Sequence, residues 1–186
     1  MKIAVFCGSG SGSDAIFAEA AVGMADAMVS RGHELVYGGG KTGLMGTIAD
    51  AVLERGGNVY GVMPKALRDK EIQHAGVTQL YIVDDMHERK AKMADLADAF
   101  IAMPGGIGTL EEIFEAWTWG QLGYHTKPCG FLNVDGYYDQ LLDFIQHIAD
   151  KQFMAQEYAT MVQVDAAPDR LLDLLETYIP PRQKWS

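Results

Sequence analysis

The sequence predicts an α/β fold, a single-domain Rossmann-like doubly wound parallel sheet with helices on both faces. Short apolar runs alternate with segments whose apolar residues recur at helical spacing. Strands that are apolar along their whole length are typical of parallel sheets, because helices cover such sheets on both faces. Glycine-rich turns also follow several of the apolar runs. The strands are then expected to be joined by right-handed crossovers, with any ligand beyond their carboxyl ends.

The alternation assigns strands and helices in chain order. Residues 2–7 predict the first strand, and a helix over residues 14–31 follows, with Ser13 as its expected N-cap and Gly32 just after its end. The mixed polar residues 65–76 predict a loop with one helical turn. The other expected strands are 34–37, 59–63, 79–83, 99–103, 129–133 and a weak one at 161–164. The other expected helices are 44–55, 86–96, 109–122, 137–149 and 168–177.

Composition limits the class of protein. A chain of 186 residues suits one domain, expected over residues 1–180, with residues 181–186 as a loose tail. The net charge is −10 and no basic stripe occurs, so binding to nucleic acid is not expected. Cys7 and Cys129 lie in apolar runs and indicate thiols in a reducing compartment. No apolar run reaches the roughly 18 residues that span a bilayer, and we expect a cytoplasmic protein with no membrane contact.

Three glycine-rich turns fall at predicted strand ends, at residues 8–12, 38–46 and 104–108, and a weaker one falls at Gly61. Glycine lets a backbone approach a ligand closely, and a helix that starts after such a turn favours an anion. Three turns at one edge of a sheet therefore indicate a nucleotide or sugar phosphate. A dinucleotide fingerprint is not met, because residue 13 is serine and no acid ends the second strand; the spacing of a P-loop is not met either.

Charged residues beside these turns have two interpretations. Arg89 follows the fourth strand and could present a planar fork to phosphate or ribose, or could belong to a charged helix start capped by Asp84 or Asp85. Glu111 and Glu112 fall in the expected first turn of the helix after the third glycine turn. They are about 100° apart, so at most one faces a ligand, and alternatively both only favour the helix dipole. The five histidines are scattered, and no metal site is expected.

The motifs together resemble those of a known family. Residues 104–112 fill the pattern P-G-G-x-G-T-x-x-E, and Met86-His87-Glu88-Arg89-Lys90 precedes it. Three further segments, at residues 7–9, 37–40 and 43–46, complete the pattern in the same order. Nearly the whole chain, from residue 2 to about residue 180, is similar to the Lonely Guy (LOG) family of cytokinin riboside 5′-monophosphate phosphoribohydrolases, which is often labelled lysine decarboxylase-like.

The resemblance implies hydrolysis of the N-glycosidic bond of a purine nucleoside 5′-monophosphate, with adenine or an N6-modified adenine as the base, to the free base and ribose 5-phosphate. Arg89 and Glu112, one strand apart, correspond to the family's catalytic pair, and no metal or other cofactor is implied. A homodimer with sites near its interface is also implied, and the aromatic segment 117–124 would suit that interface. The residues expected to bind substrate are Ser9, Gly39, Gly40, Met45, Glu71, Lys90, Gly105, Gly106, Gly108, Thr109, Leu110, Glu111 and Thr118.

Other functions stay open at the level of sequence. A nucleotide-binding or carrier protein would need the glycine turns but not both Arg89 and Glu112, and a hydrolase of a different nucleotide would keep both. A decarboxylase would need pyridoxal phosphate on a Schiff-base lysine, which nothing in the sequence indicates. The chain departs from the family at Gly10, where serine is usual, and at Phe17, where tyrosine is usual.

Overall fold

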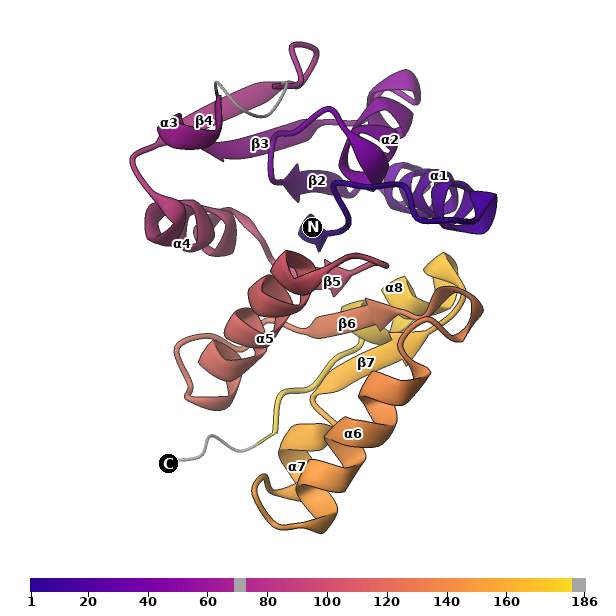
Figure 1. Cartoon of the computed structure of the whole chain (residues 1–186), viewed down its shortest axis with the longest axis vertical. Coiled ribbons are helices and arrows are strands. Elements are labelled where there is room, and N and C mark those ends of the chain that lie inside the picture. The colour runs from indigo at the N-terminus through magenta and orange to yellow at the C-terminus, as the bar shows by residue number, and fades with distance from the viewer. Residues whose placement is uncertain (69–72, 182–186) are drawn as a thin grey trace.

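One parallel sheet organises the molecule. The computed structural model describes residues 1–68 and 73–181, and within them seven strands pair in the order β4-β3-β2-β1-β5-β6-β7, which runs from top to bottom in Figure 1. Every pairing along this order is parallel, which confirms the predicted fold class. The strands are β1 Lys2–Phe6, β2 Glu34–Tyr37, β3 Val59–Pro64, β4 Gln79–Val83, β5 Ala99–Ala102, β6 Cys129–Leu132 and β7 Val162–Asp165.

Helices cover both faces of the sheet and form two apolar cores. On one face lie α1 Ala15–Ser30, α2 Gly43–Glu54 and α8 Pro168–Glu176, and on the other lie α4 Met86–Leu96, α5 Ile107–Gln121, α6 Asp139–Asp150 and the short α7 Gln156–Ala159 (Figure 1). The short α3 Lys65–Arg68 and a 3-10 turn, η1 Val134–Gly136, complete the described helices. Alternate residues of the central strands point into the two cores, since side chains of a strand alternate between its faces.

The strand order places a crevice beside β1. The chain builds outward from β1 to β4 at one edge, and α4 then crosses back beneath β3, β2 and β1 to reach β5 on the other side of β1. The connections therefore reverse direction between β1 and β5. In open parallel sheets, ligands bind at such a reversal, outside the carboxyl ends of the strands. The glycine turns after β1 and β5 flank this point.

Helix α5 begins two residues earlier than predicted. Its N-cap is Gly106, and its first residue is Ile107 rather than Thr109. Glu111 and Glu112 therefore lie in the second turn, and the expectation that they share the first turn was wrong. They are too far along the helix for the strongest part of its dipole, which acts within one turn of the end.

Other sequence-based details also need correction. The N-cap of α1 is Asp14, whose carboxylate accepts from the Ile16 N–H at 3.0 Å, and not Ser13. Gly61 lies inside β3, paired with Leu80, and forms no turn. Gly32 follows α1 at a φ of +69°, as expected for the residue after a helix end. None of the helices in residues 1–68 and 73–181 is both long and apolar enough to cross a bilayer.

Candidate active site

The start of α5 leaves its backbone amides open. Gly106 is the N-cap and carries no side chain, so no side-chain hydrogen bond caps the helix. The first amides of a helix have no partner within it, and they attract an anion when nothing else satisfies them. A Cβ atom added at Gly106 or Gly108 would meet no atom within 4 Å. The two glycines therefore keep a space clear in front of these amides.

The turns after β1 and β5 pack closely against each other. The Gly8 N–H donates to the Pro104 carbonyl at 3.0 Å. A Cβ atom on Gly105 would lie 2.8 Å from the Gly8 nitrogen and would overlap the Thr109 hydroxyl oxygen. Real Cβ atoms do not approach backbone this closely, so glycine is required at residue 105. This packing holds the open end of α5 against the end of β1.

Arg89 is buried on α4 and faces the turn after β2. A Cβ atom on Gly38 would overlap the Arg89 Nη2 atom, so the glycine leaves room for the guanidinium in this position. The Nη1 atom donates to Met86 Sδ at 3.8 Å, while Nε is buried with no hydrogen-bond partner among the described residues. Burial of a guanidinium is costly unless its charge is compensated. The compensating group is a carboxylate on α5.

That carboxylate belongs to Glu112. Its Oε1 atom lies 3.9 Å from Arg89 Nη2, and the side chains of Arg89 and Glu112 are 9% and 13% exposed. The distance is long for a direct hydrogen bond, and it brings the two charges together without joining them tightly. An acid and a guanidinium from two different helices thus meet at the crevice.

A cavity of about 330 Å³ joins the open helix start to this pair. The Cys7 thiol also lines it, and burial together with the nearby Glu112 carboxylate raises the pKa of that thiol. Cys7 is therefore protonated at neutral pH and is a poor nucleophile. The cavity is lined by Cys7, Gly8, Ser9, Met45, Met86, Arg89, Gly106, Ile107, Gly108, Thr109, Glu111 and Glu112.

Most of the predicted catalytic and phosphate-binding residues therefore meet in one cavity. Beside Arg89 and Glu112, it gathers six of the residues expected to bind substrate: Ser9, Met45, Gly106, Gly108, Thr109 and Glu111. The residues expected to bind substrate that do not line it are Gly39, Gly40, Lys90, Gly105, Leu110 and Thr118. Glu71 lies outside the described residues.

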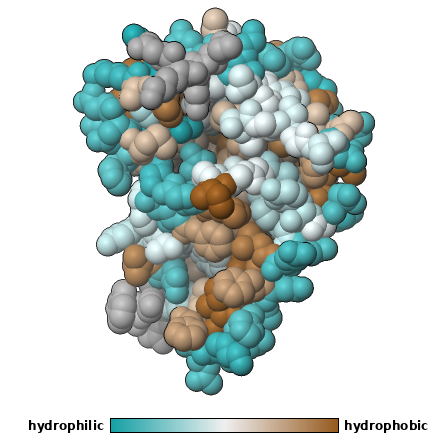
Figure 2. All heavy atoms as spheres, viewed as in Figure 1, coloured by the Kyte–Doolittle hydropathy of each residue, from teal (hydrophilic) through white to brown (hydrophobic). Residues whose placement is uncertain are grey.

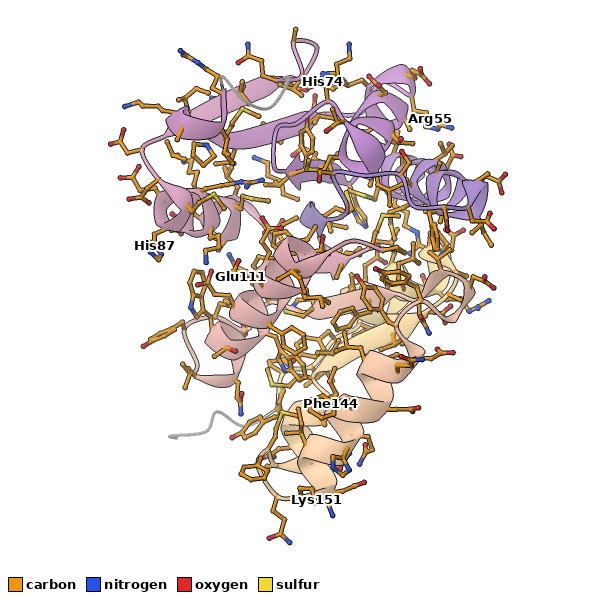
Figure 3. The ribbon with its side chains drawn as sticks, in the orientation of Figure 1. Arg55, His74, His87, Glu111, Phe144 and Lys151 are labelled. Atoms are coloured by element: carbon orange, nitrogen blue, oxygen red, sulfur yellow. The ribbon has the colours of Figure 1, made fainter. Side chains whose placement is uncertain are left out.

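The residues that miss the cavity have other contacts. Lys90 Nζ donates to Glu111 Oε1 at 2.5 Å and to Glu115 Oε1 at 3.1 Å, which ties α4 to α5; Figure 3 shows Glu111 at the end of α5 nearest α4. Neighbouring residues of a helix point about 100° apart, so Arg89 and Lys90 face different neighbours. Gly40 forms a bridge with Gln73.

Thr118 lies six residues beyond Glu112, about 9 Å further along α5. Its hydroxyl donates to the Phe114 carbonyl at 2.7 Å, and its side chain lines a separate apolar cavity. Gly105 and Leu110 line a different cavity beneath the same loop. Within one chain these residues surround the site rather than face it.

The structure adds residues that the sequence analysis did not assign. Gly38 makes room for Arg89, and Met86 and Ile107 line the cavity. Met86 lies three residues before Arg89 on the same helix, a spacing that could have indicated it. Ile107 is 82% exposed, which is unusual for isoleucine and marks it as a candidate contact for a ligand or partner. No group of three or more histidine, cysteine or acidic side chains in residues 1–68 and 73–181 is arranged to hold a metal ion.

Comparison with known proteins gives the family. A family model described as possible lysine decarboxylase matches residues 45–175. A probable cytokinin riboside 5′-monophosphate phosphoribohydrolase of Oryza sativa subsp. japonica is 50% identical over 99% of this chain and 85% of its own length. A cytokinin riboside 5′-monophosphate phosphoribohydrolase of Arabidopsis thaliana is 48% identical over 96% of this chain and 84% of its own length.

Solved structures share the fold at lower identity. The molybdenum cofactor binding protein of Rippkaea orientalis has a TM-score of 0.71 at 19% identity, and covers 95% of each chain. The molybdenum cofactor carrier protein of Chlamydomonas reinhardtii has a TM-score of 0.69 at 18% identity, over 94% of this chain and 96% of its own. Identities this low establish the architecture alone. The family model and the relatives with nearly half or more of their residues identical go further, and they confirm the resemblance seen in the motifs: the chain belongs to the LOG family.

Proposed function

We propose that this protein hydrolyses the N-glycosidic bond of a purine nucleoside 5′-monophosphate and releases the free base and ribose 5-phosphate. The observation that carries the proposal is the meeting of Arg89 and Glu112 beside an uncapped helix start in one cavity. A nucleotide carrier would need the helix start for the phosphate, but it would not need a buried carboxylate next to it. The relatives are named as cytokinin riboside 5′-monophosphate phosphoribohydrolases, which supports the same reaction.

The start of α5 would hold the 5′-phosphate. No side chain caps its first amides. Thr109, in the first turn, is buried and only 4% exposed. Binding energy from a phosphate that does not react can be used to orient the sugar at the reacting carbon. The phosphate would therefore fix the ribose between this loop and the pair on α4 and α5.

Glu112 would act at the ribose. Loss of the base builds positive, oxocarbenium-like charge at C1′, and a carboxylate beside it stabilises that charge and accepts a proton from the attacking water. The water oxygen then bonds to C1′, and the electron pair of the broken bond leaves with the base, which takes up a proton. Arg89 would bind ribose or phosphate oxygens and favour the ionised form of Glu112.

Purified protein incubated with AMP tests the reaction directly. We expect equal amounts of adenine and ribose 5-phosphate to appear, measured by chromatography of the reaction mixture. The Glu112→Gln variant should lower kcat by at least ~10²-fold, the lower range for an acid–base group, while AMP still binds. Glutamine keeps the size of the side chain and removes its charge.

The matched control is Glu115→Gln on the same helix. Glu115 bonds to Lys90 but does not line the cavity, so its kcat should stay within a few-fold of the wild-type value. If Glu112→Gln retained near-normal turnover, Glu112 would lose its assigned role. If wild-type protein bound AMP and released no base from any purine nucleotide, the carrier function would replace the hydrolase.

A decarboxylase, the activity in the family's description, has little support. Lys90 is held by two glutamates, and Lys127 donates through Nζ to the Ala94 carbonyl at 2.7 Å. A Schiff-base lysine needs an uncharged amine, whereas the two glutamates raise the pKa of Lys90. The relatives' names favour an N6-modified adenine as the base, and relative rates on AMP and isopentenyladenosine monophosphate would decide it.

We also infer a homodimer that uses the surface formed by α5 and α6. Hydrophobic side chains gather over these helices in Figure 2, and Phe144, labelled on α6 in Figure 3, is 58% exposed. Two shallow cavities of about 370 and 170 Å³ lie on this surface. Trp117 from the predicted aromatic segment is instead buried in the core of its own chain. Apolar patches of this kind mark protein contacts more often than free surface.

Light scattering tests the dimer. The wild-type protein should have a mass near twice 20.3 kDa, and Phe144→Glu should shift it toward the monomer, because burying a charge in an apolar interface is costly. Ile82→Glu, which changes an exposed apolar residue on the edge strand β4, should leave the dimer intact. A wild-type monomer at micromolar concentration would contradict the inference.

A further inference from the structure

The loop after β5, residues 103–106, contains the proposed phosphate site. Three of its carbonyls accept hydrogen bonds from other segments of the chain. Its consecutive carbonyls at Met103, Pro104 and Gly105 each accept from a different donor. Tyr138 Oη donates to Met103 at 2.7 Å, the Gly8 N–H to Pro104 at 3.0 Å, and Tyr137 Oη to Gly105 at 2.7 Å. Two neighbouring tyrosines of another segment thus bind the loop through the carbonyls on either side of Pro104.

The turn before these tyrosines contains two residues with a left-handed backbone. After β6 the chain passes through η1, where Asp135 has a φ of +50° and Gly136 a φ of +70°. A left-handed backbone is uncommon for residues other than glycine, although aspartate adopts it more readily than most. Asn133 bridges this turn, because its Oδ1 accepts from the Tyr138 N–H at 2.8 Å and its Nδ2 donates to Asp139 Oδ1 at 2.7 Å. The turn is therefore built to place both side chains.

The two rings are also packed in place. The Tyr138 ring meets Phe131 at 4.7 Å and Tyr137 at 4.9 Å between centroids, and Tyr137 meets Phe17 at 5.7 Å, all in edge-to-face geometry. Burial raises the pKa of Tyr138, so its hydroxyl keeps the proton that it donates. Tyr137 is 46% exposed, and its hydroxyl still reaches the loop.

We propose that Tyr137 is a positioning residue that aims the Gly106 amide of the loop at the phosphate. Tyr138 holds the Met103 carbonyl at the start of the loop, and the next residue, Pro104, has no N–H to aim. The carbonyl of one residue and the N–H of the next belong to one planar trans peptide, and they point in opposite directions. When Tyr137 holds the Gly105 carbonyl, the Gly106 N–H must point away from Tyr137. Tyr137 and Gly106 both line a neighbouring cavity beside the turns after β1 and β5, but only Gly106 also lines the cavity that contains Arg89 and Glu112. The inference rests on the proposed function only in that the phosphate binds to this loop.

Binding of ribose 5-phosphate, followed by calorimetry, tests this role without any turnover. Tyr137→Phe keeps the ring and its packing and removes only the donor. We expect its Kd for ribose 5-phosphate to rise about threefold to tenfold, the scale of one hydrogen bond. The Kd for AMP should rise by the same factor. The Kd for adenosine, which lacks the phosphate, should equal the wild-type value.

Tyr60→Phe is the matched control. Tyr60→Phe also loses a hydroxyl hydrogen bond, to Glu34 at 3.1 Å, but Tyr60 lies near the amino end of β3, whereas the loop follows the carboxyl end of β5. Its Kd for ribose 5-phosphate should not change. Tyr138→Phe, a second control, loses the hydrogen bond to the Met103 carbonyl, and its Kd for ribose 5-phosphate should rise less than that of Tyr137→Phe, because Pro104 has no N–H to aim.

Two results would overturn the proposal. One is an unchanged Kd for ribose 5-phosphate in folded Tyr137→Phe protein. The other is an equal loss of adenosine and ribose 5-phosphate binding, which would indicate general damage to the site. Base release from AMP is measured separately, so a protein that binds ribose 5-phosphate but does not hydrolyse AMP would refute the hydrolase and leave this inference standing.

Discussion

Helices α4 and α5 both begin at the carboxyl edge of the sheet, yet their first turns are completed in opposite ways. At the start of α4, Asp85 accepts from the His87 and Glu88 amides at 2.8 and 2.9 Å, and Glu88 accepts from the Asp84 N–H at 2.8 Å. At the start of α5, Gly106 offers no side chain, and no acid lies in the first turn. One helix satisfies its own amides, and the other leaves them open.

We infer from this contrast that a helix start is left available to an anion when the chain supplies no side-chain cap. Without a cap, both helices would start with the same dipole and with the same amides that have no partner inside the helix. Acids fill the start of α4, which leaves that helix to contribute Arg89 from its buried side. Glycines fill the start of α5 and keep its acid, Glu112, for the second turn. In the proposed function, this division assigns phosphate binding to one helix and the cation of the pair to the other.

An acid placed at the start of α5 should erase the contrast. In Gly108→Asp the new carboxylate would have open space and would lie where the phosphate is proposed to bind. Like charges in contact cost several kcal/mol, so KM for AMP should rise by roughly 10²-fold or more. Steady-state kinetics with AMP gives this value, and the melting temperature should stay the same or rise, because an acid suits a helix start.

Gly108→Asn separates the effect of the negative charge on KM from the effect of the added side-chain volume. Asparagine has nearly the same shape as aspartate, so any further rise of KM in Gly108→Asp comes from the negative charge. If both variants raised KM equally, the open amides would not be the phosphate site, and space alone would explain the glycine.

The fold could be predicted from the sequence because its signals are local. Continuous apolar runs and helical spacing located all of the described strands, and the bounds of β2, β4 and α4 agree with the predicted ranges. The four-residue helix α7 was missed, since so short a segment shows no periodicity. The order of strands was not local information. Arg89 follows the edge strand β4, which three strands separate from β5, and only the crossover by α4 brings it to Glu112.

The site could be predicted only in part for a related reason. Motif positions identified the loop and the pair, but they carry no direction for each side chain. Lys90 follows Arg89 directly and yet turns to Glu111 and Glu115. The tyrosines at 137 and 138 gave no signal near the loop, because they reach it across 32 and 35 residues of sequence. Contacts of that range follow from the strand order rather than from any local pattern.

The cap of α4 gives the complementary prediction. Asp85→Ala removes the acceptor of two amides, and the melting temperature should fall by about 2–4 °C, the usual scale for a lost helix cap in a protein of this size. KM for AMP should change little, because Asp85 does not line the cavity. Thermal unfolding and AMP kinetics on the same preparation check both parts. A large rise of KM with no change in melting temperature would mean that the start of α4 also binds substrate.

The pH dependence of this cap identifies its charge. The Glu88 and His87 amides that bond to the Asp85 carboxylate lower the pKa of Asp85 below its usual value. A lowered folded-state pKa means that the stabilisation is complete above the unfolded pKa of about 3.9 and is lost as pH falls through the folded value. The gap in stability between wild type and Asp85→Ala should therefore be constant near neutral pH and narrow below about pH 4. Asparagine can cap the helix without a charge, so the difference in stability between Asp85→Asn and Asp85→Ala should not narrow at low pH. If both stability differences narrowed in parallel, the acid sensitivity would belong to other carboxylates.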